Sequence, residues 1–167
     1  MPFYVKQGQI PMQRHTVFRK PDNMLYAEEL VSTHGFSSLY SLVYHCHPPT
    51  LVKQIRDPYD VSPNIARDKH LKHTSLKGFQ VQAKDDYLES RTPVLVNEDL
   101  HISLAAPRQS MDDYFYKNSQ ADEIVFIHQG SGRLKTGYGN IPFKYGDYLV
   151  IPRGTIYQME FEQKENR

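Results

Sequence analysis

Tyr116, Asn118 and Glu123 carry a phenol, an amide and a carboxylate at spacings that could build a polar site between β-strands. Residues two positions apart in a strand point to the same side of its sheet, so Tyr116 and Asn118 share one face. Four residues separate Asn118 from Glu123, and six residues separate Glu123 from Gly130. We expect the three side chains to lie close together, either as hydrogen-bonding groups or as ligands.

A second segment, GDYLVIPRGTIYQMEF, supplies a further phenol. Gly146, Pro152 and Gly154 have the spacing of turn residues around a strand, and Tyr157 follows Gly154 after two residues. Phe161 stands four positions beyond Tyr157. We expect Tyr157 to lie on a strand that faces the first segment, so that its phenol completes the polar set.

The two segments have the spacing of the paired cupin motifs, H-x-H-x4-E-x6-G and G-x5-P-x-G-x2-H-x3-N. The histidines and the glutamate of that pattern suit Fe(II) or Mn(II). Here Tyr116, Asn118 and Tyr157 replace the histidines, and Glu123 alone remains. Because a phenol has an unperturbed pKa of about 10 and an amide oxygen is a weak ligand, we predict no catalytic metal in this barrel. We favour a hydrogen-bonded polar cluster that fills the interior over a small-molecule pocket.

Other candidate ligands are weaker. His45 and His47 form the one literal H-x-H of the chain, but no acid follows within a few residues. His70 and His73 could share a helix face near Asp68, although the surrounding lysines favour a solvated face. No serine or cysteine stands in a nucleophile motif, and no helix pattern follows the Gly-x-Gly sequences. The glycines are instead expected at hairpin turns that need a positive φ: Gly130, Gly132, Gly137, Gly139 and Gly146.

Composition predicts a soluble, cytoplasmic, globular chain. Its 167 residues include 20 Lys and Arg against 19 Asp and Glu, which gives no basic surface for nucleic acid. Cys46 is the only cysteine, so no internal disulfide can form and a reducing compartment is expected. No stretch approaches the roughly 20 apolar residues that span a bilayer, and no signal-peptide core opens the sequence.

Short β-rich stretches broken by Gly, Asn and Pro predict an all-β fold: a cupin-type jelly-roll barrel with an extended N-terminal arm and few short helical turns. Residues 1–24 form the arm. Leu25–Thr33 is expected to be a brief helix with Asp22 as N-cap, Leu39–His47 a buried strand, and Asn64–His73 the place of one helical turn. Further strands are predicted at Phe79–Ala83, Pro93–Val96, His101–Ala105, Tyr114–Lys117, Glu123–His128, Arg133–Thr136, Ile141–Phe143, Tyr148–Ile151 and Tyr157–Glu162.

We expect one structural domain, in which residues 1–98 form the arm and a wrapping segment packed on the barrel, and residues 99–167 form the degenerate cupin barrel. A jelly roll usually closes with an apolar strand, whereas this sequence stops in the polar run EQKENR. A missing strand would leave a sheet edge unpaired. We therefore expect either the N-terminal piece of a longer polypeptide or an oligomer partner that covers the edge.

The segment from Arg14 to Thr50 resembles the N-terminal region of bacterial homogentisate 1,2-dioxygenases. The similar parts are the LYAEEL run, the following Gly-Phe-Ser, and the ending Leu-x-Tyr-x-x-x-Pro-Pro. The runs YKNSQADEIVFIHQGSG and GDYLVIPRGTIY resemble that family's N-terminal cupin half, which likewise lacks metal ligands. These stretches cover about half of the chain, and residues 51–115 match loosely.

The resemblance implies a larger, bicupin-like enzyme that uses non-haem Fe(II) and O2 to convert homogentisate to maleylacetoacetate in tyrosine and phenylalanine catabolism. It places the iron ligands and a catalytic histidine in a C-terminal half, so no cofactor and no catalytic role falls on a residue of this chain. Family members assemble as trimers or hexamers, with the N-terminal half helping to build the assembly. The chain alone is expected to be inactive.

Two alternatives stay open at the level of sequence. The parent enzyme could act on a different aromatic substrate. The chain could also be a stand-alone, non-catalytic cupin that binds a small ligand or serves as an assembly module. A metal-dependent sugar isomerase is disfavoured by the lost histidines.

Overall fold

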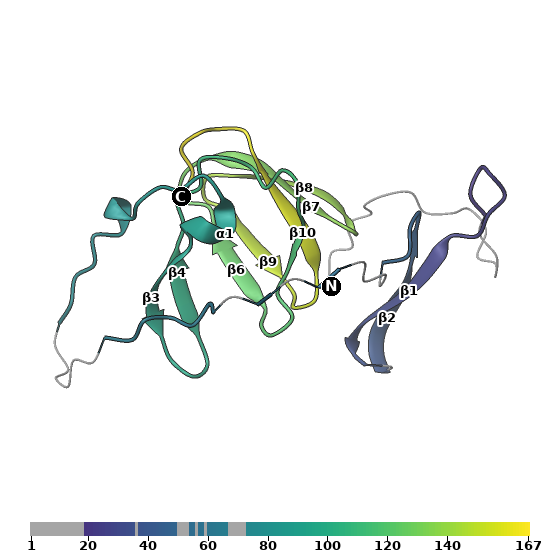
Figure 1. Cartoon of the computed structure of the whole chain (residues 1–167), viewed down its shortest axis with the longest axis horizontal. Helices are drawn as coiled ribbons and strands as arrows, with labels where there is room; N and C mark the ends of the chain where they lie inside the picture. Colours follow the sequence, from purple (N-terminus) through teal and green to yellow (C-terminus); the bar gives the residue numbers. More distant parts are fainter. Residues whose placement is uncertain (1–18, 36, 50–53, 56, 59, 67–72) are drawn as a thin grey trace. The chain divides into compact units, whose positions relative to one another are not determined.

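The computed structural model describes residues 19–35, 37–49, 54–55, 57–58, 60–66 and 73–167 (Figure 1). The described chain belongs to two compact units, a smaller one within Gln9–Val61 and a larger one that contains Ser62–Arg167. None of the described helices has the length and apolar character needed to cross a membrane. The first eighteen residues of the predicted arm lie outside the described residues.

The smaller unit is a β-hairpin. Strand β1 (Ala27–His34) pairs antiparallel with β2 (Ser37–His45), and Leu30 stands opposite Leu42. The predicted helix at Leu25–Thr33 is therefore wrong. The run LYAEEL has good local helix propensity, but the neighbouring segment is rich in β-formers and supplies a full partner strand, so pairing overrides propensity.

The turn before β1 corrects a second expectation. Asp22 caps no helix: its carboxylate accepts a hydrogen bond from the Met24 amide at 3.0 Å, in a tight turn where Asn23 has a φ of 65°. The predicted strand Leu39–His47 does form, as β2, but its predicted burial is wrong because Leu39 is 76% exposed.

The larger unit consists of short antiparallel strands with a 3-10 turn and a one-turn helix. Its elements are η1 (Gly78–Gln80), α1 (Tyr87–Ser90), β3 (Thr92–Val96), β4 (His101–Leu104), β5 (Tyr116–Lys117), β6 (Glu123–Phe126), β7 (Ser131–Thr136), β8 (Gly139–Lys144), β9 (Tyr148–Ile151) and β10 (Ile156–Phe161). Strands β5, β10, β7 and β8 form a four-stranded sheet in that order, while β3–β4 and β6–β9 are two-stranded ladders. The predicted all-β class is confirmed.

Two local predictions in this unit are wrong. Phe79–Ala83 was expected to be a strand, whereas η1 occupies its start. No helical turn forms at residues 64–66 or at His73, and residues 67–72 between them lie outside the described part. The helix α1 was not predicted, because a single turn gives too little periodicity to recognise.

The core of the larger unit centres on β10. Tyr157 and Met159 are completely buried, and Gln158 between them donates its side-chain amide to the carbonyls of Asp112 and Tyr114 at 3.2 and 3.1 Å. Both faces of β10 are thereby covered. Around it pack the buried residues Tyr87, Met111, Ile127, Leu134, Phe143, Leu149 and Ile151.

The polar tail is held by backbone hydrogen bonds. Arg167 and Gln129 exchange two such bonds, at 2.9 and 3.1 Å, and the Arg167 carbonyl also accepts from the His128 amide at 2.8 Å. Asn166 is 5% exposed and donates its side-chain amide to the carbonyls of Pro107 and Gln163. The end of the described chain therefore lies directly beside the residues that follow β6.

Two of the five glycines that were expected to have a positive φ do not have one. Gly130, Gly139 and Gly146 have positive φ, whereas Gly132 and Gly137 do not. Gly132 lies within β7, where an added Cβ would overlap the Glu160 carbonyl oxygen and lie 2.8 Å from the Phe143 ring. Gly132 is therefore required by the close approach of β10.

The substitution Gly132→Ala should lower the free energy of unfolding by about 1–3 kcal/mol, because β7 and β10 must separate to admit the methyl group. Gly137→Ala is the matched control: no atom lies within 4 Å of its added Cβ, so stability should stay within about 0.5 kcal/mol or rise slightly. Urea unfolding of the chain measures both. Equal losses for the two variants would contradict this packing.

Candidate functional site

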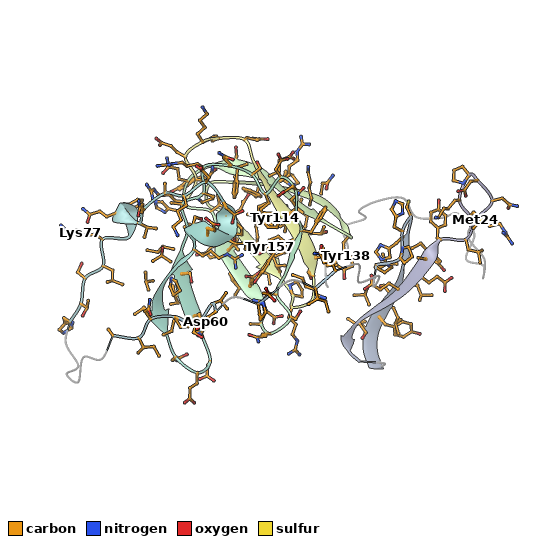
Figure 2. All side chains as sticks on the ribbon, in the orientation of Figure 1. Met24, Asp60, Lys77, Tyr114, Tyr138 and Tyr157 are labelled. Carbon is orange, nitrogen blue, oxygen red and sulfur yellow. The ribbon has the colours of Figure 1, made fainter. Side chains whose placement is uncertain are left out.

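The residues expected to line a polar interior come from three strands of the larger unit. Tyr116 on β5 stands directly opposite Tyr157 on β10, and their rings meet edge to face at 5.5 Å with an interplanar angle of 85°. Glu123 is the first residue of β6. Figure 2 shows Tyr157 among the strands of this unit. The structure thus brings Tyr116, Glu123 and Tyr157 together.

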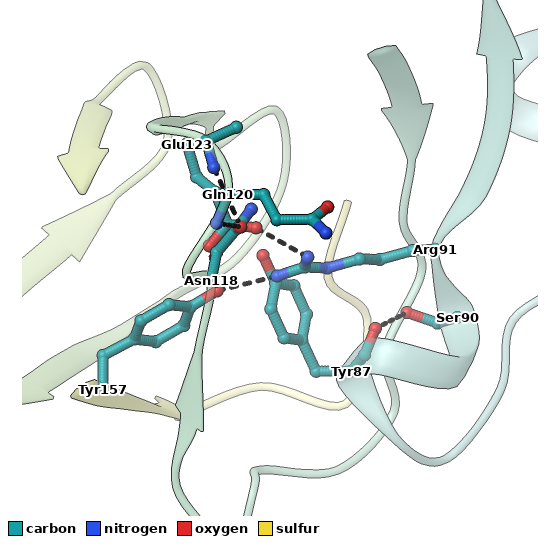
Figure 3. Close-up of polar contacts among 8 residues, drawn as sticks. Tyr87, Ser90, Arg91, Asn118, Gln120, Glu123 and Tyr157 are labelled. Atoms are coloured by element: carbon teal, nitrogen blue, oxygen red, sulfur yellow. Dashed lines mark hydrogen bonds and ion pairs between the residues drawn. The ribbon is translucent and has the colours of Figure 1, made fainter. Parts of the chain in front are cut away.

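An arginine that the motifs did not indicate joins these side chains (Figure 3). The guanidinium of Arg91 donates from Nη1 to Glu123 Oε1 and from Nη2 to the Tyr157 hydroxyl, each at 2.7 Å. The Tyr157 hydroxyl donates in turn to Glu123 Oε2 at 2.8 Å. The three groups form a closed triangle, in which each carboxylate oxygen accepts one bond and the phenol both accepts and donates. We call Arg91, Glu123 and Tyr157 the Arg91 triad.

Aromatic rings enclose the guanidinium. The Arg91 Cζ atom lies 4.5 Å from the centre of the Tyr87 ring and 5.1 Å from that of Tyr116, in the range of cation–π attraction. The side chains of Arg91 and Glu123 are only 23% and 13% exposed. Removal of water strengthens the attraction between these charges, and it also makes either charge costly to leave alone.

The position of Arg91 is fixed by the turn of helix that precedes it. Asp86 is the N-cap of α1 and accepts the Glu89 amide at 3.0 Å. The second carboxylate oxygen of Asp86 accepts the hydroxyl of Tyr114, which lies two residues before β5. The aspartate therefore anchors the start of α1 to the four-stranded sheet, and Arg91 leaves the other end of the turn aimed at Glu123.

The environment keeps the phenols neutral and the guanidinium charged. Burial raises the pKa of Tyr157 well above its ordinary value, with Tyr87 and Glu123 adding to the rise and Arg91 opposing it. Burial likewise raises the pKa of Tyr87. For Arg91, burial acts to lower the pKa, but Tyr87, Tyr157 and Glu123 together outweigh it and raise the value.

This set of donors does not fit a divalent metal ion. Both oxygens of Glu123 are already bonded, one to a cation and one to a phenol proton. A metal ion at the point where the side chains converge would meet the positive charge of Arg91. Among the described residues, no group of three or more His, Cys, Asp and Glu side chains is placed to hold an ion. The chemistry available here is that of an internal ion pair.

Asn118, the fourth predicted site residue, has a different role. Its side-chain oxygen accepts the amides of Gln120 and Ala121 at 3.0 and 3.1 Å, and its carbonyl accepts the Gly154 amide at 2.6 Å. Asn118 thereby shapes the turn that leads into β6 and sets where Glu123 begins. The two cupin-like segments meet at this Asn118–Gly154 bond.

Sequence reasoning missed Arg91 and Tyr87, which lie in the loosely matching region before the barrel motifs. One signal was present. Glu123 retains the acid of the cupin pattern although the histidines and their metal ion are lost, and a buried carboxylate then needs another positive partner. The sequence did not show which of its basic residues would supply that partner, because Arg91 precedes Glu123 by 32 residues.

The histidine pairs do not build a second site in the described chain. His45 Nε2 lies 2.7 Å from Glu29 Oε2 across the β1–β2 hairpin, which is a simple side-chain pair. His47 lies beyond the end of β2 and is exposed, as is His73. His70 lies outside the described residues.

Comparison with known proteins identifies the relationship. The family model described as homogentisate 1,2-dioxygenase N-terminal matches residues 7–167. The chain belongs to this family. The expected resemblance is confirmed, and the match includes residues 51–115, whose similarity to the family is loose.

Two curated relatives are much longer than this chain. A protein of Saccharolobus solfataricus named "Putative dioxygenase SSO1533" is 36% identical over 163 residues, which cover 98% of this chain and 42% of the relative. The homogentisate 1,2-dioxygenase of Legionella pneumophila (strain Lens) is 26% identical over 155 residues, covering 84% of this chain and 36% of the relative. The chain spans less than half the length of either.

Removal of the cation should destabilise the fold through Glu123. Arg91→Met is expected to lower the free energy of unfolding by about 3–5 kcal/mol, because it leaves a carboxylate buried without a partner. Adding Glu123→Gln to that variant should restore part of the loss. Urea unfolding of the two single variants and the double variant measures the coupling.

The control for this cycle is Arg108→Met, which removes a 60% exposed side chain 3.9 Å from Asp85. Its effect should stay within about 0.5 kcal/mol. If the losses of the two single variants at Arg91 and Glu123 simply added in the double variant, the pair would not be energetically coupled.

Raised tyrosine pKa values predict a specific loss of stability in alkali. Tyrosines in the unfolded chain ionise at about pH 10. In the folded chain Tyr87 and Tyr157 keep their protons above that pH, because their pKa values are raised. Their contribution is complete below about pH 10 and declines above it, by roughly 1.4 kcal/mol per pH unit for each phenol. Tyr157→Phe should therefore make the decline shallower, as measured by urea unfolding between about pH 9 and pH 11. An equal slope in Tyr157→Phe and in the unmodified chain would contradict the raised pKa of this phenol.

Proposed function

We propose that this chain is the N-terminal structural domain of an Fe(II)-dependent, aromatic ring-cleaving dioxygenase of the homogentisate type. The reaction proposed for the complete enzyme is the O2-dependent opening of homogentisate to maleylacetoacetate, in tyrosine and phenylalanine catabolism. The iron that this reaction needs is assigned to the remaining part of the polypeptide. Family membership supports the class of enzyme, and the name of the Legionella relative supports the substrate.

The observation that carries the structural role is the Arg91 triad. Its guanidinium occupies the point where the side chains of β5, β6 and β10 converge, so Glu123 and Tyr157 are bonded to a group of the chain itself. Groups bonded in this way are not free to bind a substrate or O2. The triad does tie α1, β6 and β10 to one another, which is what a rigid scaffold requires.

We assign the C-terminal portion of the enzyme as the partner of this domain within one polypeptide, and a homo-oligomer, trimer or hexamer, as the assembled state. The balanced charge supports the absence of nucleic acid among its partners. The single, exposed Cys46 supports a reducing, cytoplasmic location.

Oxygen uptake tests the proposal directly. The protein expressed from the full reading frame and loaded with Fe(II) should consume O2 when homogentisate is added, and the 167-residue chain should not. Arg91→Met in the longer protein should lower its melting temperature and leave kcat/KM unchanged well below that temperature, because the triad touches no substrate.

Turnover of homogentisate by the 167-residue chain would contradict the assignment of the chemistry to another part of the protein. Iron-loaded longer protein that is inactive with homogentisate, but active with another ring substrate, would retain the enzyme class and change the substrate. Inactivity with every aromatic substrate would favour the stand-alone assembly module.

A further inference from the structure

The two faces of the β6–β9 ladder differ in burial, and the outward face is apolar. Leu149 and Ile151 point into the core and are 6% and 3% exposed. On the opposite side the cross-strand pairs are Ile124 with Val150 and Phe126 with Tyr148. These four side chains are 69%, 66%, 42% and 67% exposed, in that order. We call Ile124, Phe126, Tyr148 and Val150 the β6–β9 face.

Aromatic residues outside the two strands extend this face. The Phe126 and Tyr148 rings lie 4.7 Å apart, and His128 lies 6.2 Å from both Phe126 and Tyr145. Phe79 packs edge to face on His128 at 4.9 Å, although it is itself 64% exposed. The result is a continuous apolar and aromatic surface, which in a globular protein usually marks an interface.

A neighbouring part of the same unit shows the usual surface chemistry of an antiparallel sheet. Arg133 on β7 stands opposite Glu160 on β10, and the Lys135 ammonium lies 3.1 Å from the Glu160 carboxylate. The outward positions there are charged, whereas none of the four residues of the β6–β9 face is. Apolar outward residues therefore distinguish this ladder from the β7–β10 pair; the β3–β4 ladder has one such pair, Leu95 and Ile102, which are 57% and 44% exposed.

We propose that the β6–β9 face is the docking surface for the C-terminal portion of the enzyme, which would present a complementary apolar surface of low charge. This inference rests on the proposed function. The matching family model is an N-terminal one and the curated relatives are more than twice as long, so in such proteins further chain follows the matched region. The Arg167 backbone is bonded to His128 and Gln129, so chain that continues from it starts beside this face.

Hydroxyl-radical footprinting with mass spectrometry tests the proposal. Phe126 and Tyr148 should be oxidised readily in the 167-residue chain and several-fold more slowly in the protein expressed from the full reading frame. Tyr138 and Ile141, which are 46% and 40% exposed, serve as internal references and should react equally in both.

A pair of matched substitutions shows whether docking uses this face. In the longer protein, Ile124→Lys should restore rapid oxidation of Phe126 and Tyr148 and lower the melting temperature. Ile65→Lys, the same change at a position that is 72% exposed and lies outside the strands, should do neither. In the 167-residue chain both variants should melt at the temperature of the unmodified chain, because Ile124 and Ile65 are mostly exposed there.

Equal oxidation of Phe126 and Tyr148 in the two proteins would overturn the proposal, whatever the length of the reading frame. Protection already present in the monomeric 167-residue chain would overturn it too, and so would protection that disappears on dilution, which would indicate a second copy as occupant. The proposed function fails separately: a longer protein that protects the face but consumes no O2 with homogentisate would refute the activity and leave the docking surface standing.

Discussion

The buried ion pair between Arg91 and Glu123 is the constraint on which this domain depends. A carboxylate that is 13% exposed needs a partner, and here the partner comes from a segment 32 residues earlier in the chain. Tyr157, 66 residues beyond Arg91, closes the triangle. Apolar side chains of similar volume could stabilise such an interior equally well, so the pair is explained better by the geometry it imposes than by its energy. It fixes the end of α1 against β6 and β10 at once.

The triad has the outline of a metal site but different chemistry. A central cation is surrounded by a carboxylate and two phenol rings on strands that converge, as ligands would. The cation, however, is covalently part of the chain, and it binds through N–H groups that have fixed directions in one plane. Such a centre donates hydrogen bonds but has no vacant coordination position for a substrate or for O2. The glycines and prolines at the turns place the strands around the ion pair, just as they would place strands around a metal ion.

Local sequence signals located most strands in the second half of the chain, whereas in the first half they found the strand at Leu39–His47 but gave a helix in place of β1. From Thr92 onward the strands were predicted close to their observed bounds, because Gly, Pro and Asn mark the turns between short β-rich runs. The LYAEEL run misled because its helix propensity is local, whereas the choice of β-structure depends on pairing with Ser37–His45. Arg91 was missed for the same reason: a long-range contact leaves no pattern around the residue that makes it.

The ion pair also explains how β6 selects its two faces. The run Ile124–Ile127 is apolar at every position, and β9 reads Tyr-Leu-Val-Ile, so hydrophobic alternation does not define which side of either strand faces inward. A shift of one residue would turn every side chain to the opposite face. Glu123 removes that ambiguity, since its carboxylate reaches the guanidinium when Glu123 and Val125 face inward. The interior contact with Arg91 therefore determines that Ile124 and Phe126 point outward, and through the pairing with β9 it determines the same for Tyr148 and Val150. A charge pair inside the domain thus sets the composition of the apolar surface outside it.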